Sequence, residues 1–261
     1  MLSYTDVSVT YGNGRKVLSD FSLEMDAGEV VVLVGESGSG KTTAIRAAIG
    51  LLPENGRVTQ GDIKLEGQSV VQMTNKQWQG IRGNDISIIF QDSGAMLSPV
   101  RTIGSQFVEY IRFHKPMPKK DAWELGRKML EQMKLPHTQV IMKSYPFQLS
   151  GGMRQRVGIA MAMVFQPKLL LADEPTSALD VTTQAQIVRE MMSLRDSYGT
   201  SILLVTHNLG VASYMADRIV VMKDGRVVDS GNREKILNNP GDDYTRQLLE
   251  AVPDLRGKQY V

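Results

Sequence analysis

The sequence predicts an α/β fold, namely a three-layer core with a mainly parallel sheet, an antiparallel sheet near the N-terminus and an inserted helical segment. Three observations predict it. The continuous apolar run Val30–Val34 is typical of a strand buried on both faces. Strand-like segments at 169–172 and 202–205 flank a helical segment at 181–198, and this alternation implies a parallel sheet. Helical spacing dominates from residue 92 to about residue 165.

The N-terminal region alternates apolar and polar residues from Leu2 to Val9, which indicates a strand. A turn at 12–14 and a returning strand at 21–25 complete the predicted antiparallel sheet. The buried strand 30–34 follows, and we expect a helix from Lys41 to Leu52 that ends at Pro53.

Residues 57–90 are again strand-like, and a buried strand is expected at Ile86–Phe90. Turns are expected within this segment at Gly61, Gly67 and Gly83. After the helical insertion and the later strands, residues 219–228 carry a hairpin signal around Asp224-Gly225. One or two helices are expected after Asn232. Within the single domain 1–261 we expect four parts: a core formed by 1–90 and 166–230, a helical subdomain at 91–165 and a C-terminal helical tail at 231–261.

The composition is that of an ordinary globular chain. Of its 261 residues 42% are hydrophobic and 22% are charged, which excludes a disordered tail, a collagen-like fibre and a coiled coil. The 30 basic and 28 acidic residues nearly balance, so nothing suggests a nucleic-acid partner. No apolar run approaches the ~20 residues that span a bilayer, and we expect no signal peptide and a cytoplasmic location. The lack of cysteine excludes Cys-ligated zinc, iron–sulfur clusters and thiol catalysis.

Residues 35–42 match the phosphate-loop pattern G-x-x-x-x-G-K-[ST] in full, between a buried strand and a helix. Glycines let successive backbone N–H groups converge on phosphate oxygens, and the helix N-terminus adds its positive dipole end. Lys41 can reach the β- and γ-phosphates, and Thr42 can bind Mg²⁺. The predicted phosphate-contacting residues are Gly35, Glu36, Ser37, Gly38, Ser39, Gly40, Lys41, Thr42 and Thr43.

An apolar strand at 169–172 ends in the two carboxylates Asp173 and Glu174. At the end of a parallel strand, Asp173 can hold Mg²⁺ through water. Glu174 lies one residue further, where it can polarise an attacking water as a general base.

A second candidate phosphate site is Ser150-Gly151-Gly152, which precedes a predicted helix. A serine in this position is on its own simply a helix N-cap. Since the chain also has a phosphate loop, two alternatives stay open from the residues alone: either it binds two phosphates, or one site serves a neighbouring chain.

In this order, the phosphate loop, Gln91, the segment 149–155, Asp173-Glu174 and His207 resemble the nucleotide-binding subunit of an ATP-binding-cassette (ABC) transporter. The resemblance covers nearly the whole chain and implies a P-loop NTPase core that binds ATP and Mg²⁺. The resemblance implies that Tyr11 stacks on adenine and that His207 holds the γ-phosphate. It implies that Gln91 contacts Mg²⁺ and senses the membrane partner, and that Asp180 lies on the loop that crosses the dimer interface. The signature that contacts ATP would comprise Ser150, Gly151, Gly152 and Gln155. Catalysis would then rest on Lys41, Glu174 and His207.

The same resemblance implies the partners. In this family two nucleotide-binding domains meet head to tail, and each ATP lies between the phosphate loop of one and the Ser-Gly-Gly signature of the other. A heterodimer with a related subunit is favoured, and a homodimer is possible. Two membrane permeases and, indirectly, an extracytoplasmic solute-binding protein complete the expected assembly at the cytoplasmic face of the membrane.

Residues 145–156, residues 178–186 and Phe90-Gln91-Asp92 are similar to the subunits that power dipeptide, oligopeptide and nickel importers. Many peptide-importer members carry a cysteine-bearing C-terminal extension, so the lack of cysteine favours shorter members, including nickel or metal-chelate importers. The cargo itself stays open. Two other hypotheses are a soluble ABC-family ATPase of the repair or translation type, and a regulatory protein without turnover. The presence of both Glu174 and His207 speaks against the latter.

Overall fold

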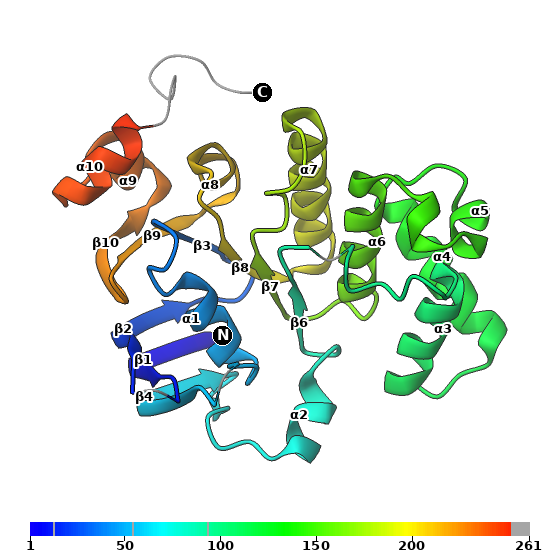
Figure 1. Cartoon of the computed structure of the whole chain (residues 1–261), viewed down its shortest axis with the longest axis horizontal. Coiled ribbons are helices and arrows are strands. Elements are labelled where there is room, and N and C mark those ends of the chain that lie inside the picture. The colour runs from blue at the N-terminus through cyan, green and yellow to red at the C-terminus, as the bar shows by residue number, and fades with distance from the viewer. Residues whose placement is uncertain (13, 54, 93, 252–261) are drawn as a thin grey trace. The chain divides into compact units, whose positions relative to one another are not determined.

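The computed structural model describes four stretches of the chain: residues 1–12, 14–53, 55–92 and 94–251. These form two compact units (Figure 1). The described residues within Met1–Gly80 and Ser201–Val261 form unit 1, and those within Ile81–Thr200 form unit 2. The chain therefore begins unit 1, builds all of unit 2, and returns to complete unit 1.

Unit 1 contains the antiparallel sheet that the alternating sequence predicts, with the strand order β2-β1-β4-β5. Tyr4 and Phe21 are buried on its inner face with ring centroids 5.0 Å apart, edge to face. The returning strand is longer than the predicted segment 21–25, and it starts at Lys16. Gly61 is not a turn: it lies inside β4 with φ +79°, where a Cβ would approach the Thr5 carbonyl oxygen to 2.3 Å. The strands are β1 (Leu2–Thr10), β2 (Lys16–Met25), β4 (Arg57–Leu65) and β5 (Gln68–Ser69).

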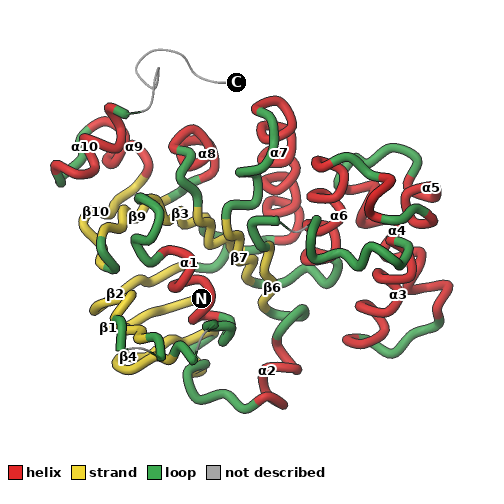
Figure 2. The backbone as a smooth tube through the Cα atoms, viewed as in Figure 1, coloured by secondary structure: helices red, strands yellow, loops and turns green. Residues whose placement is uncertain are grey.

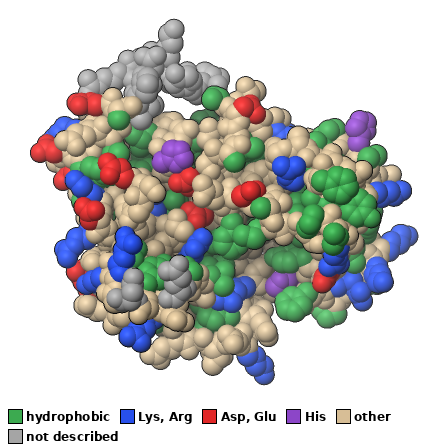
Figure 3. Space-filling view, in the orientation of Figure 1, with side chains coloured by type: hydrophobic (Ala, Val, Ile, Leu, Met, Phe, Trp, Pro, Cys, Tyr) green, Lys and Arg blue, Asp and Glu red, His purple; other side chains and the backbone are tan. Residues whose placement is uncertain are grey.

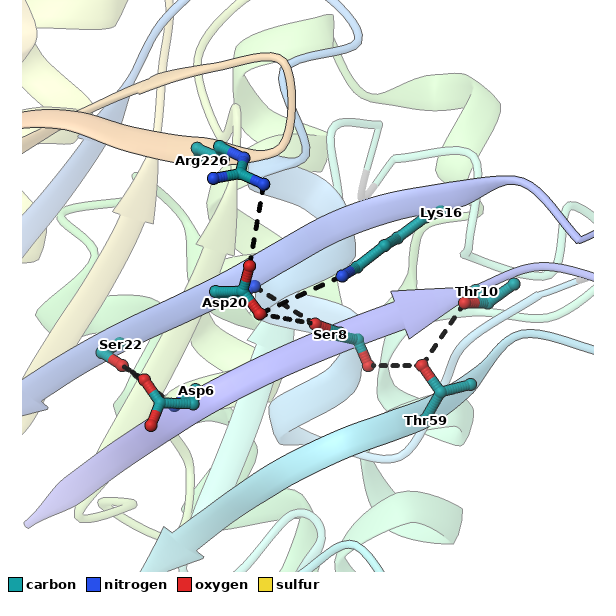
Figure 4. Close-up of polar contacts among 8 residues, drawn as sticks. All are labelled: Asp6, Ser8, Thr10, Lys16, Asp20, Ser22, Thr59 and Arg226. Atoms are coloured by element: carbon teal, nitrogen blue, oxygen red, sulfur yellow. Dashed lines mark hydrogen bonds and ion pairs between the residues drawn. The ribbon is translucent and has the colours of Figure 1, made fainter.

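The solvent side of this sheet carries a polar network (Figure 4). Asp20 on β2 lies 4.0 Å from Lys16 and 3.7 Å from Arg226, a residue of the later strand β10. Its backbone N–H donates to Ser8 Oγ on β1, at 3.2 Å. The contact with Arg226 ties the antiparallel sheet to the C-terminal hairpin of the same unit.

The second sheet region of unit 1 is mainly parallel. Its central strand β3 pairs in parallel with β8 on one side and β9 on the other, and β10 pairs antiparallel with β9. Every residue of β3 and β8 is buried, as the continuous apolar runs predict. The elements are β3 (Val30–Val34), α1 (Lys41–Ala48), β8 (Ser201–Val205), α8 (Leu209–Met215), β9 (Arg218–Lys223), β10 (Arg226–Asn232), α9 (Arg233–Asn238) and α10 (Asp243–Glu250).

Two local predictions in unit 1 are wrong for identifiable reasons. Helix α1 ends at Ala48 rather than Leu52, because Gly50 adopts φ +65° and its N–H bonds the Ala47 carbonyl. Helix α2 (Asn75–Ile81) lies in the segment predicted to be strand-like. Its N-terminus is a reciprocal cap between Thr74 and Gln77, in which the Thr74 N–H donates to Gln77 Oε1 at 2.8 Å.

Unit 2 combines two parallel strands with a group of helices, which Figure 2 colours red. The helical insertion is real, and its helices pack closely at glycines. A Cβ on Gly104 would lie 2.2 Å from the Trp123 ring, and one on Gly126 would lie 2.9 Å from the Phe107 ring. The elements are β6 (Ile86–Ile89), α3 (Ile103–His114), α4 (Lys119–Gln132), α5 (Thr138–Lys143), the 3-10 helix η1 (Pro146–Gln148), α6 (Gly151–Met163), β7 (Leu169–Asp173) and α7 (Val181–Tyr198).

Among the residues that the structure describes, no helix has both the length and the apolar character needed to cross a membrane.

Candidate nucleotide-binding site

The phosphate loop leaves the end of β3 in a conformation that only glycine accepts at several positions. Gly35 has φ +147°, and a Cβ there would lie 2.1 Å from the Met222 carbonyl oxygen on the neighbouring strand β9. Gly38 has φ +84°, and a Cβ there would meet nothing within 4 Å. The first glycine thus allows close packing, while Gly38 lies beside open space in which a ligand can approach the backbone.

Lys41 opens α1, and its ammonium group is bound inside the loop. Nζ donates to the Gly35 carbonyl at 2.8 Å and to the Glu36 carbonyl at 2.7 Å, and it also contacts Ser39 Oγ at 3.1 Å. The lysine is 6% exposed. The helix N-cap, Gly40, has no side-chain oxygen that could accept from the first N–H groups of α1. These N–H groups and the positive charge of Lys41 together suit this helix start to binding an anion.

Two later segments of unit 1 also hold the loop. The Gly225 N–H, in the turn between β9 and β10, donates to the Ser39 carbonyl at 3.1 Å. The Glu36 N–H donates to the hydroxyl oxygen of Tyr244 on α10, at 3.0 Å. Sequence reasoning missed Tyr244, because 208 residues separate it from Glu36 and no motif links the two.

Tyr11 and His207, both predicted from the resemblance, lie in the same unit as the loop. Tyr11 follows β1 and is half-buried, and its hydroxyl is 3.2 Å from Thr43 Oγ1 on α1. His207 follows β8, the strand that pairs with β3. Since parallel strands end at the same sheet edge, the loop and His207 share that edge.

The exposed His207 is framed by two local hydrogen bonds. Thr206 Oγ1 accepts from the Asn208 N–H at 3.0 Å, and Asn208 Oδ1 accepts from the Gly210 N–H at 2.8 Å at the start of α8. These turns fix the backbone on both sides of the imidazole.

In unit 2, Gln91 and the acidic pair also occupy one sheet edge. Gln91 follows β6, and Asp173 ends β7, which pairs with β6 in parallel. Asp173 is 5% exposed. Glu174 adopts φ +48°, a left-handed conformation that is uncommon for a residue with a side chain. Such strain at a strand end is typical of functional positions.

The Ser-Gly-Gly segment opens α6. Ser150 Oγ caps the helix by accepting from the Met153 N–H at 3.3 Å. A Cβ on Gly151 would meet only one atom, at 4.0 Å, whereas a Cβ on Gly152 would lie 2.7 Å from Thr183 Cγ2 on α7. Gly152 therefore serves packing within the chain, and Gly151 faces space that another molecule can enter.

Gln155 and Asp180 both form hydrogen bonds within unit 2. Gln155 is 5% exposed, and its Nε2 donates to the Pro175 carbonyl at 2.6 Å, which links α6 to the turn after Glu174. Asp180 caps α7 by accepting from the Thr183 N–H at 3.0 Å. Hydrogen bonds from Thr183, first through its backbone N–H, hold the pKa of Asp180 below its usual value.

An ion pair fixes α6 against α7. Arg156 Nε lies 3.0 Å from Glu190 Oε2, and the Glu190 side chain is 1% exposed. Burial raises the pKa of Glu190, and Arg156 opposes that rise. The pair thus links α6, the helix that Ser150 begins, to α7.

A lysine held by the backbone of a glycine-rich loop, between a buried parallel strand and a helix, defines this chain as a P-loop nucleotide-binding protein. Comparison with known proteins makes the class specific. The family model described as "ABC transporter" matches residues 18–177. The chain belongs to the ABC transporter family, and it is an ATPase cassette of that family.

Two curated relatives illustrate the similarity. The chain is 46% identical over 232 residues to the oligopeptide transport ATP-binding protein AppD of Bacillus subtilis, covering 88% of this chain and 71% of the relative. It is 42% identical over 259 residues to the oligopeptide transport ATP-binding protein AmiE of Streptococcus pneumoniae, and this match covers 98% of this chain and 73% of the relative. Among solved structures, a dimeric post-hydrolysis state of the ATP-binding cassette MJ0796 bound to ADP and Pi matches with a TM-score of 0.79 at 28% identity, covering 89% of this chain and 99% of that one.

Proposed function

We propose that this chain is the ATP-hydrolysing subunit of a peptide importer. The observation that carries the proposal is the Lys41 ammonium, held inside a glycine loop at the start of α1. The relatives named for oligopeptide transport support the peptide class. A soluble ABC-family ATPase of the repair or translation type is not favoured, because these relatives are transport proteins.

The site residues have the donor chemistry that MgATP needs. The hydroxyl of Thr42, the side-chain amide of Gln91 and the carboxylate of Asp173 would supply oxygen ligands of the kind that Mg²⁺ prefers. When bound, Mg²⁺ would neutralise phosphate charge. Lys41 and the loop N–H groups of residues 35–43 would stabilise the charge that develops on the γ-phosphoryl group.

The remaining catalytic roles concern water and the base. Glu174, displaced from the strand path by its left-handed backbone, would accept a proton from the attacking water. His207, framed by Thr206 and Asn208, would orient that water and contact the γ-phosphate. Tyr11 would stack on adenine, with its hydroxyl near Thr43 fixing the ring.

A second cassette would complete the site. Ser150, Gly151 and Gly152 would contact the ATP held by the partner's phosphate loop, since Gly151 borders open space. Asp180 would lie at the same dimer interface. Gln155 would act as a positioning residue through its bond to Pro175. We favour a heterodimer with a related subunit, and a homodimer is compatible with the same residues.

The helices of unit 2 would contact two membrane permeases at the cytoplasmic face of the membrane. Between α3 and α4 lies a groove of about 940 Å³, and exposed Phe113 is among its lining residues. Figure 3 shows hydrophobic and basic side chains close together over this group of helices. Residues 91–165 would form the helical subdomain that transmits closure of the dimer to the permeases, together with Gln91.

The cargo class rests on the relatives alone. Peptides delivered by an extracytoplasmic solute-binding protein are the proposed cargo, and transport of nickel or a metal chelate stays a prediction. Co-purification of the chain with permease subunits from a native membrane extract would support the importer. If no permease co-purified with the chain, that result would support the soluble ATPase.

The substitution Glu174→Gln tests the proposed function. Removing the base while keeping the shape should reduce phosphate release from MgATP at least 100-fold and shift the chain toward a dimer in size-exclusion chromatography with MgATP. The matched control is Glu24→Gln, a change at an exposed position of β2. Wild-type turnover in Glu174→Gln would remove this residue from its proposed role.

A further inference from the structure

The phosphate loop of unit 1 has a contact that the P-loop pattern does not include. The hydroxyl oxygen of Tyr244 accepts the Glu36 N–H at 3.0 Å. Tyr244 lies on α10, near the C-terminal end of the described chain, and it is 7% exposed. A buried aromatic side chain from a distant helix thus touches the loop backbone directly.

The contacted peptide group is the one between Gly35 and Glu36. Its N–H is bound by Tyr244, and its carbonyl oxygen, that of Gly35, accepts from Lys41 Nζ at 2.8 Å. The two bonds hold opposite ends of one rigid peptide plane. If Lys41 turned from the carbonyl toward a phosphate, the bond from the Glu36 N–H to Tyr244 would still hold this peptide.

Tyr244 is itself held from several directions. Its backbone N–H donates to Asp242 Oδ1 at 2.8 Å, and Lys223 Nζ lies 4.7 Å from the centroid of its ring. Burial is the main cause that raises the pKa of Tyr244 above its usual value. These contacts and the bond to Glu36 hold the ring beside the loop.

The segment that carries Tyr244 is fastened to the sheet by Asp229 on β10. Asp229 Oδ2 accepts from the Gly241 N–H at 2.8 Å and from the Asp242 N–H at 3.2 Å. The carboxylate is 6% exposed and lies 3.7 Å from Lys235 Nζ. We call residues 240–250 the C-terminal arm. Through Asp229 the arm is anchored to the strand that precedes it.

We propose that Tyr244 is a positioning residue for nucleotide binding, through which the C-terminal arm holds the first peptide of the phosphate loop in its binding conformation. The proposal rests on the proposed function, because it assumes that this loop binds the nucleotide. It assigns to α10 a part in the ATP site that the P-loop residues alone do not reveal.

The test compares Tyr244→Phe with Thr245→Val in the full chain. Tyr244→Phe removes only the hydroxyl that accepts from Glu36. Thr245→Val changes the adjacent buried residue, whose Oγ1 has no hydrogen-bond partner among the described residues, and leaves Tyr244 intact. Binding of MgADP is measured by isothermal titration calorimetry, and KM and kcat are measured for MgATP.

We expect Tyr244→Phe to raise both the Kd for MgADP and the KM for MgATP about 3- to 10-fold, the range of one lost hydrogen bond, with kcat changed less than twofold. Amide hydrogen exchange at Glu36 should become faster, and Thr245→Val should behave as wild type in all four measurements. An unchanged Kd in Tyr244→Phe would overturn the proposal, as would an equal rise in Thr245→Val. If Lys41→Ala also leaves the Kd unchanged, the proposed function has failed instead.

Discussion

The two units present their site residues in different ways. In unit 1 the phosphate loop is held by residues of the same unit, because Lys41, Gly225 and Tyr244 each form a hydrogen bond with its backbone. In unit 2 the Ser-Gly-Gly segment borders open space at Gly151. One half of the proposed site is therefore shaped by contacts within its own unit, whereas the other half borders space that a second molecule can enter.

The largest expected effect comes from Lys41→Ala, which removes the charge that organises the unit 1 loop. The variant should lose at least 100-fold in affinity for MgADP by calorimetry, because it loses a charge-assisted contact to phosphate and the bonds that shape the loop. Lys76→Ala, at an exposed position on α2, is the matched control. Unchanged affinity in Lys41→Ala would show that the loop is not where the nucleotide binds.

The next largest effect is expected for Gly151→Asp in unit 2. A Cβ at this position is sterically free, so the fold should be retained, while the new carboxylate would repel the phosphates of an ATP bound by a partner. Turnover should fall about 10- to 100-fold on that basis, with affinity for MgADP unchanged. A reduced affinity of monomeric Gly151→Asp for MgADP would contradict the proposal that the unit 1 loop binds the nucleotide and that Gly151 contacts only the ATP of a partner.

A smaller effect, on stability, is expected for Gly104→Ala on α3. The added methyl group would lie 2.2 Å from the Trp123 ring and 2.6 Å from the Met142 carbonyl oxygen, so the helices must separate. The cost should be about 1–3 kcal/mol of unfolding free energy, measured by urea denaturation. Gly80→Ala, where a Cβ meets nothing within 4 Å, is the control. Because alanine favours a helix more than glycine does, the control should lose no stability, and an equal change in both variants would contradict the packing argument.

Much of this could be predicted from the sequence, because the signals are local. Continuous apolar runs predicted β3 and β8, and the glycine pattern predicted the phosphate loop. What failed depends on tertiary contacts or on short caps. The reciprocal cap of Thr74 and Gln77 starts a helix in a segment that reads as strand. No local pattern could place Tyr244 against Glu36, since a chain of packed strands and turns brings them together.

The positions of the candidate residues are described, while their roles stay predictions. Within unit 1 the strand pairing puts the phosphate loop and His207 at one sheet edge, and within unit 2 it does the same for Gln91 and Asp173. The parallel direction of the strands was predictable from the alternation of strands and helices, whereas their neighbours were not, because β3 pairs with β8 and β6 with β7 across long stretches of chain. The bond from Gln155 to Pro175 was not predictable, because a motif position gives no sign of which way an amide points.

The smallest expected effect concerns the charge of Asp180 at the start of α7. Hydrogen bonds from Thr183 hold the pKa of Asp180 below the usual value of about 3.9. A lowered pKa in the folded state means that ionised Asp180 contributes stability above the unfolded pKa, and that this contribution is lost as the pH falls through the folded value. Asp180→Asn keeps a good cap without the charge. We expect wild type to be slightly more stable than the variant between pH 5 and 7, by thermal unfolding without nucleotide, and the difference to shrink as the pH falls below the usual pKa of an aspartate, about 3.9. A difference that grows as the pH falls would show that the helix start of unit 2 is held by something other than this carboxylate.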